Sequence, residues 1–260
     1  KEEEEEERRD GKENSKEGVR KKCSLEADFS PPRLVARRPH FSGCALRDGR
    51  SWFICEYHMG YTLLEFADTP SLSASLPRAL RTLPYPYEGT DAAALNGSVA
   101  YAHDDQLVLF NLTNSMTHRL PLTVAQESLY NDSLSRISVQ SDEHGLWVLY
   151  RIPSDDALTV SRVAVPALNV VSTWRVASVK PRSLCSAFIR CGILYTLTCA
   201  SNSATLRPAY DFYSAVDIVG REITLTGISA VSSAQYDATS HTLSIFSRGS
   251  ILSLDVKGTR

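Results

Sequence analysis

The chain has 260 residues, of which 43% are hydrophobic and 22% are charged, and its formal net charge is −2. A nearly neutral chain offers no general electrostatic attraction for nucleic acid or anionic lipid. No run reaches the roughly 18 apolar residues that a membrane-spanning helix needs.

Residues 1–22 differ sharply in composition from the rest. They carry nine acidic and eight basic side chains, and Val19 is their one bulky aliphatic residue. Without the apolar positions of a coiled coil, this segment is expected to be a charged, disordered linker. We therefore expect a single domain over residues 23–260, preceded by upstream sequence that is missing here.

After the linker, apolar and polar side chains alternate with a period of two, which is typical of β-strands. The alternating segments occur in pairs separated by turn residues, as hairpins do. The expected hairpins are 51–56 with 61–66, 98–102 with 107–112, 146–150 with 158–163, 193–197 with 205–210, and 242–246 with 251–256.

These hairpins recur at a nearly constant interval. Their first strands begin near residues 51, 98, 146, 193 and 242, so the intervals are 47, 48, 47 and 49 residues. A repeat of this length is typical of β-propeller blades, and five units of about 47 residues fill ~235 residues. A β-sandwich also has many short strands but would not require constant spacing. The sequence predicts an all-β, five-bladed β-propeller.

Six cysteines lie at positions 23, 44, 55, 185, 191 and 199. Cys44 and Cys55 are equidistant from a turn at Asp48-Gly49, a dipeptide that favours a tight hairpin, so they should face each other across it.

Cys185 and Cys199 are centred on Gly192 in the same way, which permits a second cross-strand bridge. Cys23 and Cys191 are then left as partners. Free thiols or zinc ligands are the alternative, but Cys-x-x-Cys spacing, an HExxH motif and a histidine cluster are all absent. We therefore favour three disulfides, which occur in oxidising compartments.

Three glycosylation sequons begin at Asn96, Asn111 and Asn131, each in or beside a turn-like segment. Sequons occur often by chance, but together with paired cysteines they favour an extracellular glycoprotein.

Four segments resemble motifs of the olfactomedin domain, in the family's order. Residues 89–101 read GTDAAALNGSVAY and are similar to GTGxVVYNGSLYY. Residues 142–150 read DEHGLWVLY and are similar to DExGLWVIY, while Trp174 is similar to the tryptophan of its TW pair. Residues 187–195 read AFIRCGILY and are similar to AFxxCGxLY. The chain is thus similar to this family over roughly residues 23–257.

The resemblance implies an olfactomedin-like five-bladed propeller, closed by one disulfide between an N-terminal cysteine and the cysteine of CGxLY. These are Cys23 and Cys191 here. Residues 43–48 are similar to the family's GxWMRDP segment, which follows the first cysteine, so Cys44 lies inside that segment. Disulfides within the pairs 44/55 and 185/199 would depart from the family pattern.

The resemblance also implies a function: a non-catalytic extracellular protein-protein interaction module of matrix, cell adhesion or cell-surface signalling. We expect a secreted protein or the ectodomain of a membrane protein, with an extracellular or cell-surface partner. Oligomerisation would run through the missing upstream sequence. Tyr85, Tyr87 and Tyr130 lie in expected loops and are candidate contact positions, with packing against a blade edge as the alternative.

Many domains of this family hold calcium in the central channel with side-chain oxygens from three strands. The corresponding positions here are Ser138, Ser186 and Gln235, so both of the family's aspartates are replaced by neutral residues. Calcium requires hard oxygen ligands, and carboxylates supply most of the affinity. We predict that the calcium site is lost, unless a register slip brings in Asp142 or Asp237.

The short catalytic motifs GxSxG, GxGxxG and the Walker loop are absent, and the histidines fall mostly beside expected turns. We therefore predict that the chain is not an enzyme. The alternative is an extracellular hydrolase with its site in the channel, since catalytic groups are defined by geometry and not by sequence distance.

Overall fold

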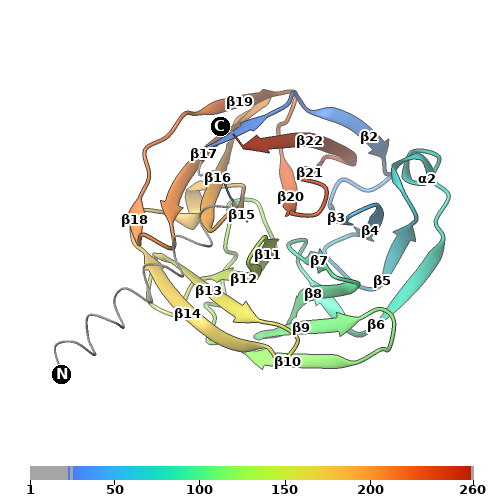
Figure 1. Ribbon diagram of the computed structural model, residues 1–260, viewed down its shortest axis with the longest axis horizontal. Helices are drawn as coiled ribbons and strands as arrows, with labels where there is room; N and C mark the ends of the chain where they lie inside the picture. The colour runs from blue at the N-terminus through green and yellow to red at the C-terminus, as the bar shows by residue number, and fades with distance from the viewer. Residues whose placement is uncertain (1–22, 24–25, 259–260) are drawn as a thin grey trace.

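Five antiparallel sheets form a ring around a central axis in the computed structural model (Figure 1). The structure describes residue 23 and residues 26–258, and the expected linker over residues 1–22 lies outside them. The predicted all-β five-bladed propeller is confirmed.

Each blade is a meander that runs from the axis outward. Blade 1 contains β3 (Gly43–Asp48), β4 (Ser51–Glu56), β5 (Met59–Phe66) and β6 (Ala79–Glu88). Blade 2 contains β7 (Ala93–Leu95), β8 (Ser98–His103), β9 (Gln106–Asn111) and β10 (Thr117–Pro121). Blade 3 contains β11 (Ser138–Asp142), β12 (Gly145–Tyr150), β13 (Leu158–Ala164) and β14 (Asn169–Val176).

The last two blades differ from this four-stranded pattern in their outer strands. Blade 4 contains β15 (Ser186–Arg190), β16 (Ile193–Cys199) and β17 (Ser203–Asp211), with β18 (Val216–Asp217) and β19 (Ile223–Thr226) both paired to β17. Blade 5 contains β20 (Val231–Asp237), β21 (Thr242–Ser247) and β22 (Ser250–Gly258). The short helices are α2 (Thr69–Ser73) and η1 (Pro181–Ser183). Within the described residues, no helix has the length and apolar character needed to cross a bilayer.

The predicted hairpins are the second and third strands of the five blades. Each of the ten expected segments overlaps one observed strand, from β4 and β5 in blade 1 to β21 and β22 in blade 5. Strand alternation and turn residues are local signals, so these hairpins could be recognised without knowledge of the ring.

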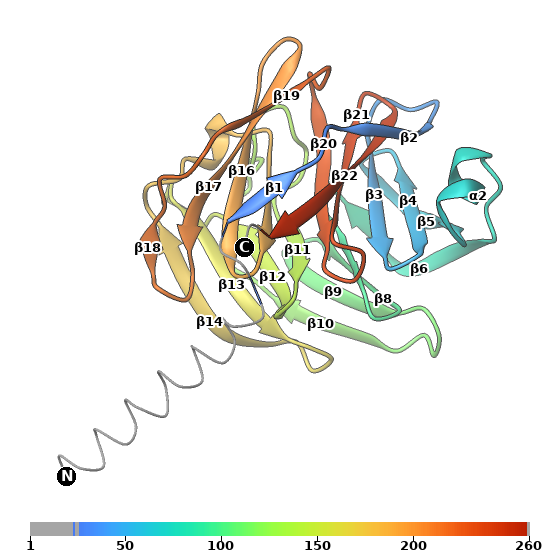
Figure 2. The same ribbon diagram turned by 45° about the horizontal axis from the view of Figure 1, so that its top comes forward.

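The ring is closed by the first strands of the chain. β1 (Ala27–Phe29) and β2 (Arg33–Arg37) both pair antiparallel with β22, the last strand, as Figure 2 shows. Cys23, just before β1, is bonded to Cys191 in the turn between β15 and β16. This bond confirms the predicted disulfide between the N-terminal segment and a later blade.

Hydrophobic packing fills the space between every pair of neighbouring blades. Five buried clusters occur in the described part of the chain, and each joins residues of two adjacent blades. Alternation along β3 illustrates the cause: Ala45 packs towards blade 5, whereas Cys44 and Leu46 pack towards blade 2. Each fully buried large side chain contributes roughly 1.5–3 kcal/mol, so the blades depend on one another.

Aspartates at the ends of three inner strands link each of those blades to the next one. The side chain of Asp48 accepts a hydrogen bond from the Gly97 amide at 2.7 Å, and Asp142 accepts one from the Gly192 amide at 2.8 Å. Asp237 accepts one from Gly49 at 3.1 Å, which joins blade 5 to blade 1.

Candidate functional site

A hollow of about 600 Å³ opens where the inner strands begin. It is lined by Ser42 before β3, by Leu184 before β15 and by Ser232 at the start of β20, with Phe41 and Arg248 at its rim. We call it the first hollow. Phe41 is 76% exposed there, so apolar surface lies beside polar backbone.

A second hollow of about 430 Å³ opens where the inner strands end. We call it the acidic hollow because Asp48, Asp142, Glu143 and Asp237 line it. The three aspartates accept the inter-blade bonds described above, and Asp142 also accepts a hydrogen bond from the Trp147 indole at 2.7 Å. These carboxylates therefore hold the blades together.

Between the hollows the channel is filled by a group of buried polar side chains. We call it the channel cluster: Asp91, Ser138, Gln140, Ser186 and Gln235, each at most 5% exposed. The residues come from β11, β15, β20 and the segment before β7, so four of the five blades contribute. The predicted positions Ser138, Ser186 and Gln235 do lie in the inner strands.

Asp91 is the carboxylate of this cluster. Its Oδ1 lies 3.4 Å from the Ser138 hydroxyl, and its Oδ2 is buried without a hydrogen-bond partner. Burial raises the pKa of the Asp91 carboxyl from 3.8 to about 7, since the charged form is deprived of water. Hydrogen bonds from Ser135 and Ser138 oppose that rise.

The channel cluster does not fit calcium. The three family positions supply two hydroxyls and an amide, and the Oε1 atom of Gln235 already accepts a hydrogen bond from the Arg47 amide at 3.2 Å. Gln140 turns its Nε2 group, a donor, towards the backbone oxygen of Ala234 at 3.3 Å. Calcium takes six to eight oxygen ligands, usually including several carboxylates, whereas this cluster contains a single carboxyl group.

Asp142 and Asp237, the alternatives considered for a slipped register, lie at the ends of their strands beside the acidic hollow. Their oxygens accept the hydrogen bonds of turns and of the next blade. Among the described residues, no hydrogen bond joins either carboxylate to the channel cluster.

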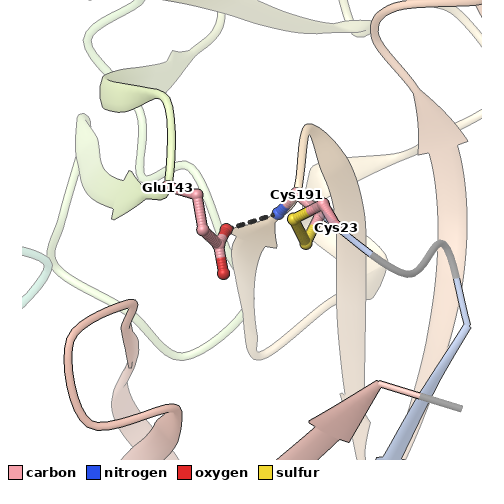
Figure 3. A group of neighbouring side chains, drawn as sticks. All are labelled: Cys23, Glu143 and Cys191. Atoms are coloured by element: carbon pink, nitrogen blue, oxygen red, sulfur yellow. Dashed lines mark hydrogen bonds between the residues drawn. A yellow bond between two sulfur atoms is a disulfide. The ribbon is translucent and has the colours of Figure 1, made fainter. Parts of the chain in front are cut away.

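Cys23, Glu143 and Cys191 bring three potential metal-ligand atoms together beside the acidic hollow (Figure 3). The two sulfur atoms are bonded to each other, so neither is available as a thiolate. Glu143 accepts a hydrogen bond from the Cys191 amide at 2.8 Å. The group fastens the N-terminal disulfide to blade 3.

Neighbouring acidic, phenolic and imidazole groups also meet in this region. The Tyr236 hydroxyl lies 2.6 Å from Glu143 and 3.1 Å from Nδ1 of His241. Burial, followed by the Glu143 carboxylate, raises the pKa of Tyr236, so the phenol stays protonated and donates to Glu143. We therefore interpret the bond between Tyr236 and Glu143 as structural, and not as part of an acid-base site.

A second acidic group connects the outer parts of blades 1 and 2. Glu88, His103 and Asp104 place ligand-type atoms within 4.8 Å of one another. Arg136 approaches Glu88 to 3.7 Å and Asp105 to 2.5 Å, and so offsets much of this negative charge. We interpret the group as an ion-pair network between blades.

The structure also contains the two additional disulfides. Cys44 and Cys55 are direct partners in the β3–β4 register, with Cα atoms 4.9 Å apart. The Cα atoms of Cys185 and Cys199 are 5.8 Å apart, and both residues line the first hollow.

The three sequon asparagines occupy different places. Asn96, in the turn between β7 and β8, lines the acidic hollow, and Asn131 lines the first hollow. Asn111 ends β9, and its Oδ1 accepts hydrogen bonds from the amides of Thr113 and Asn114. Asn96 and Asn131 are exposed, and Asn111 is half-buried.

The tyrosines considered as contact positions pack inside the molecule. Tyr87 and Tyr130 are 4% and 2% exposed, and Tyr85 stacks on the His103 ring at 5.2 Å. Their alternative role, packing within the propeller, is therefore the observed one. Tyr85 and Tyr87 both belong to β6, so the segment expected to be a loop is a strand.

Exposed apolar side chains gather instead near the β4–β5 turn. Phe41, Tyr57, Met59 and Tyr61 are each more than half exposed. The Tyr57 ring packs on His40 at 4.0 Å, next to Phe41, and the Tyr57 amide donates to the oxygen of Ser42. We call these four residues the blade 1 patch.

Sequence reasoning missed two members of the channel cluster, although a signal existed for each. Asp91 replaces the second glycine of the family's GTG motif, so this chain has a carboxyl group where the family motif has no side chain. Gln140 lies two residues after Ser138 in β11, and alternation places both side chains on the same face of the strand.

Comparison of the sequence with known proteins identifies the same family that the motifs and the five-bladed fold indicate. The sequence model of the olfactomedin-like domain matches residues 40–260. Rat myocilin is 27% identical over 158 residues, which cover 57% of this chain and 31% of myocilin. Zebrafish olfactomedin-like protein 3B is 28% identical over 177 residues, which cover 64% of this chain and 44% of that protein. The chain thus matches less than half the length of either relative.

Among solved structures, the glutaminyl cyclase of Myxococcus xanthus superposes with a TM-score of 0.53. The sequence identity is 11%, and the match covers 90% of this chain and 97% of the cyclase. At this identity the likeness concerns the fold alone.

Proposed function

This chain belongs to the olfactomedin-like domain family, and from that premise we propose that it is a non-catalytic extracellular module that binds another protein. Members of the family are typically extracellular binding modules. A disulfide-bonded olfactomedin domain is consistent with an extracellular location. The finer role that we propose is in matrix, cell adhesion or cell-surface signalling, with a secreted or cell-surface protein as partner and oligomerisation through upstream sequence.

The blade 1 patch is the observation that carries this proposal. Phe41, Tyr57, Met59 and Tyr61 are each more than half exposed, and Phe41 also lines the first hollow. Aromatic residues and methionine are enriched in the cores of protein interfaces. By comparison, the titratable groups of the acidic hollow are occupied by bonds that join the blades.

The test is capture of cell-surface and matrix proteins by the native chain and by a patch variant, Tyr57→Ser/Met59→Ser/Tyr61→Ser. We expect the variant to capture at least about tenfold less of a specific partner than the native chain does, since interface aromatics dominate binding energy. A matched control, Val170→Ser/Val171→Ser, changes two half-exposed residues of β14 in blade 3 and should retain the partner.

Equal capture by the native chain and the patch variant would refute the patch as the binding surface. Hydrolysis of a glycan or ester substrate by the purified chain, abolished by a substitution in the channel, would refute the non-catalytic role.

A further inference from the structure

Gln140 occupies the middle of the channel cluster and connects two inner strands across the axis. Its Nε2 group lies 3.3 Å from the oxygen of Ala234 in β20 and 3.2 Å from the hydroxyl of Ser138 in β11. A backbone oxygen can only accept a hydrogen bond, so the amide must place its NH₂ group there. The positive end of the amide dipole therefore points to where blades 3 and 5 meet.

Gln235 is oriented by the same kind of constraint. The amide of Arg47 donates to its Oε1 atom at 3.2 Å, and a backbone N–H can only donate. The Nε2 atom of Gln235 is then left buried without a hydrogen-bond partner. Two of the long polar side chains in the channel thus present donors, which repel a cation.

The remaining unpaired atoms are mostly acceptors or hydroxyls. Buried polar atoms without a partner include Oδ2 of Asp91, Oε1 of Gln140 and the hydroxyls of Ser186 and Ser233. In native proteins such groups are nearly always satisfied, by protein or by ordered water. A metal ion can satisfy acceptors only, whereas water can both donate and accept.

We propose that the inner strands of this propeller are bridged by the Gln140 amide and ordered water molecules, and that the channel holds no metal ion. The mixture of buried donors and acceptors matches water. The cluster also contains a single carboxyl group, Asp91, whereas calcium sites usually supply several carboxylates.

Two consequences distinguish this arrangement from a metal-dependent channel. The folded chain should be insensitive to removal of calcium, since no ion contributes to its stability. Introducing an anionic oxygen at Gln140, at nearly unchanged size, should create a dependence on calcium, since a buried carboxylate is costly unless it is paired with a cation.

The first experiment measures thermal unfolding of the native chain after treatment with EDTA, and again with millimolar CaCl₂, together with native mass spectrometry. We expect Tm to agree within about 1 °C in the two conditions and the mass to match the metal-free chain. A rise in Tm of several degrees that EDTA reverses, or a stoichiometric calcium adduct, would overturn the proposal.

The second experiment uses Gln140→Glu with Gln140→Ala as its matched control. We expect Q140E to unfold at a lower temperature in EDTA and to recover with CaCl₂, whereas Q140A should be destabilised equally in both. If Q140E gains no response to calcium, or if Q140A gains one, then the Gln140 amide is not the group that keeps calcium out of the channel. The native-chain measurement decides the metal question even if a variant fails to fold.

Discussion

Asp91 is a carboxylic acid whose chemistry depends entirely on where the ring places it. In an exposed loop it would be ionised at neutral pH, but here it is buried between Ser135 and Ser138 in the channel. A pKa raised in the folded state means that the folded protein binds its proton more tightly than the unfolded chain does. The contribution of this proton to the free energy of unfolding is therefore fully present below the unfolded pKa of 3.8. It is lost as the pH rises towards the folded pKa of about 7.

The substitution Asp91→Asn should remove this pH dependence. A shift of about three pKa units corresponds to at most about 4 kcal/mol, and we expect a gain of about 1–3 kcal/mol above neutral pH. Near the unfolded pKa the variant and the native chain should have similar unfolding free energies. Urea unfolding measured at acidic and at slightly alkaline pH checks both expectations.

Asp142→Asn is the contrasting substitution. The Asp142 carboxylate accepts hydrogen bonds from the Trp147 indole and the Gly192 amide, so its loss should destabilise the chain. If Asp91→Asn also destabilises the chain at every pH, then the Asp91 carboxyl is held in its charged form and our account of the channel cluster is wrong.

Three inner strands, β3, β11 and β20, end in an aspartate that accepts a hydrogen bond from the next blade. We expect the stability that each aspartate provides to follow the number of hydrogen bonds that it accepts. Asp237 in β20 accepts from the amides of Gly49, Thr239 and Ser240, whereas Asp48 in β3 accepts from the amide of Gly97. Both link one blade to the next.

We expect Asp237→Ala to lower the unfolding free energy by about 2–3 kcal/mol and Asp48→Ala by about 1 kcal/mol, because each amide donor loses its hydrogen bond to a carboxylate. Guanidinium unfolding of the two variants under identical conditions measures the difference. Equal losses would indicate that the turn bonds of Asp237 contribute nothing beyond the inter-blade contact.

Sequence reasoning succeeded for elements with strong local signals. The hairpin of β4 and β5 has alternating apolar residues and a turn, and Asp48-Gly49 correctly located the turn that precedes it. By contrast, β7 has three residues and β18 has two, too few for a periodic pattern. Asp91 lies outside any strand, and only the packing of blade 3 against blade 2 brings it beside Ser138, which follows it by 47 residues.

At the scale of the whole molecule, closure depends on residues that precede the matched family segment. That segment begins at residue 40, yet β1 and β2 pair with β22, and the bond from Cys23 to Cys191 spans 168 residues. A disulfide that closes a long loop typically stabilises a fold by about 2–4 kcal/mol. Without β1 and β2, the outer edge of β22 would expose unpaired backbone groups.

A chain restricted to residues 40–260 should therefore have a lower Tm and should associate through β22. We expect Cys23→Ser/Cys191→Ser in the full chain to lower Tm by roughly 5–10 °C, and the shortened chain to lose more because it also lacks two strands. A chain of residues 23–260 is the matched control and should retain the native Tm. Thermal unfolding measures the Tm of these four chains, and light scattering measures their association. A monomeric 40–260 chain with the native Tm would show that the ring closes through blade packing alone.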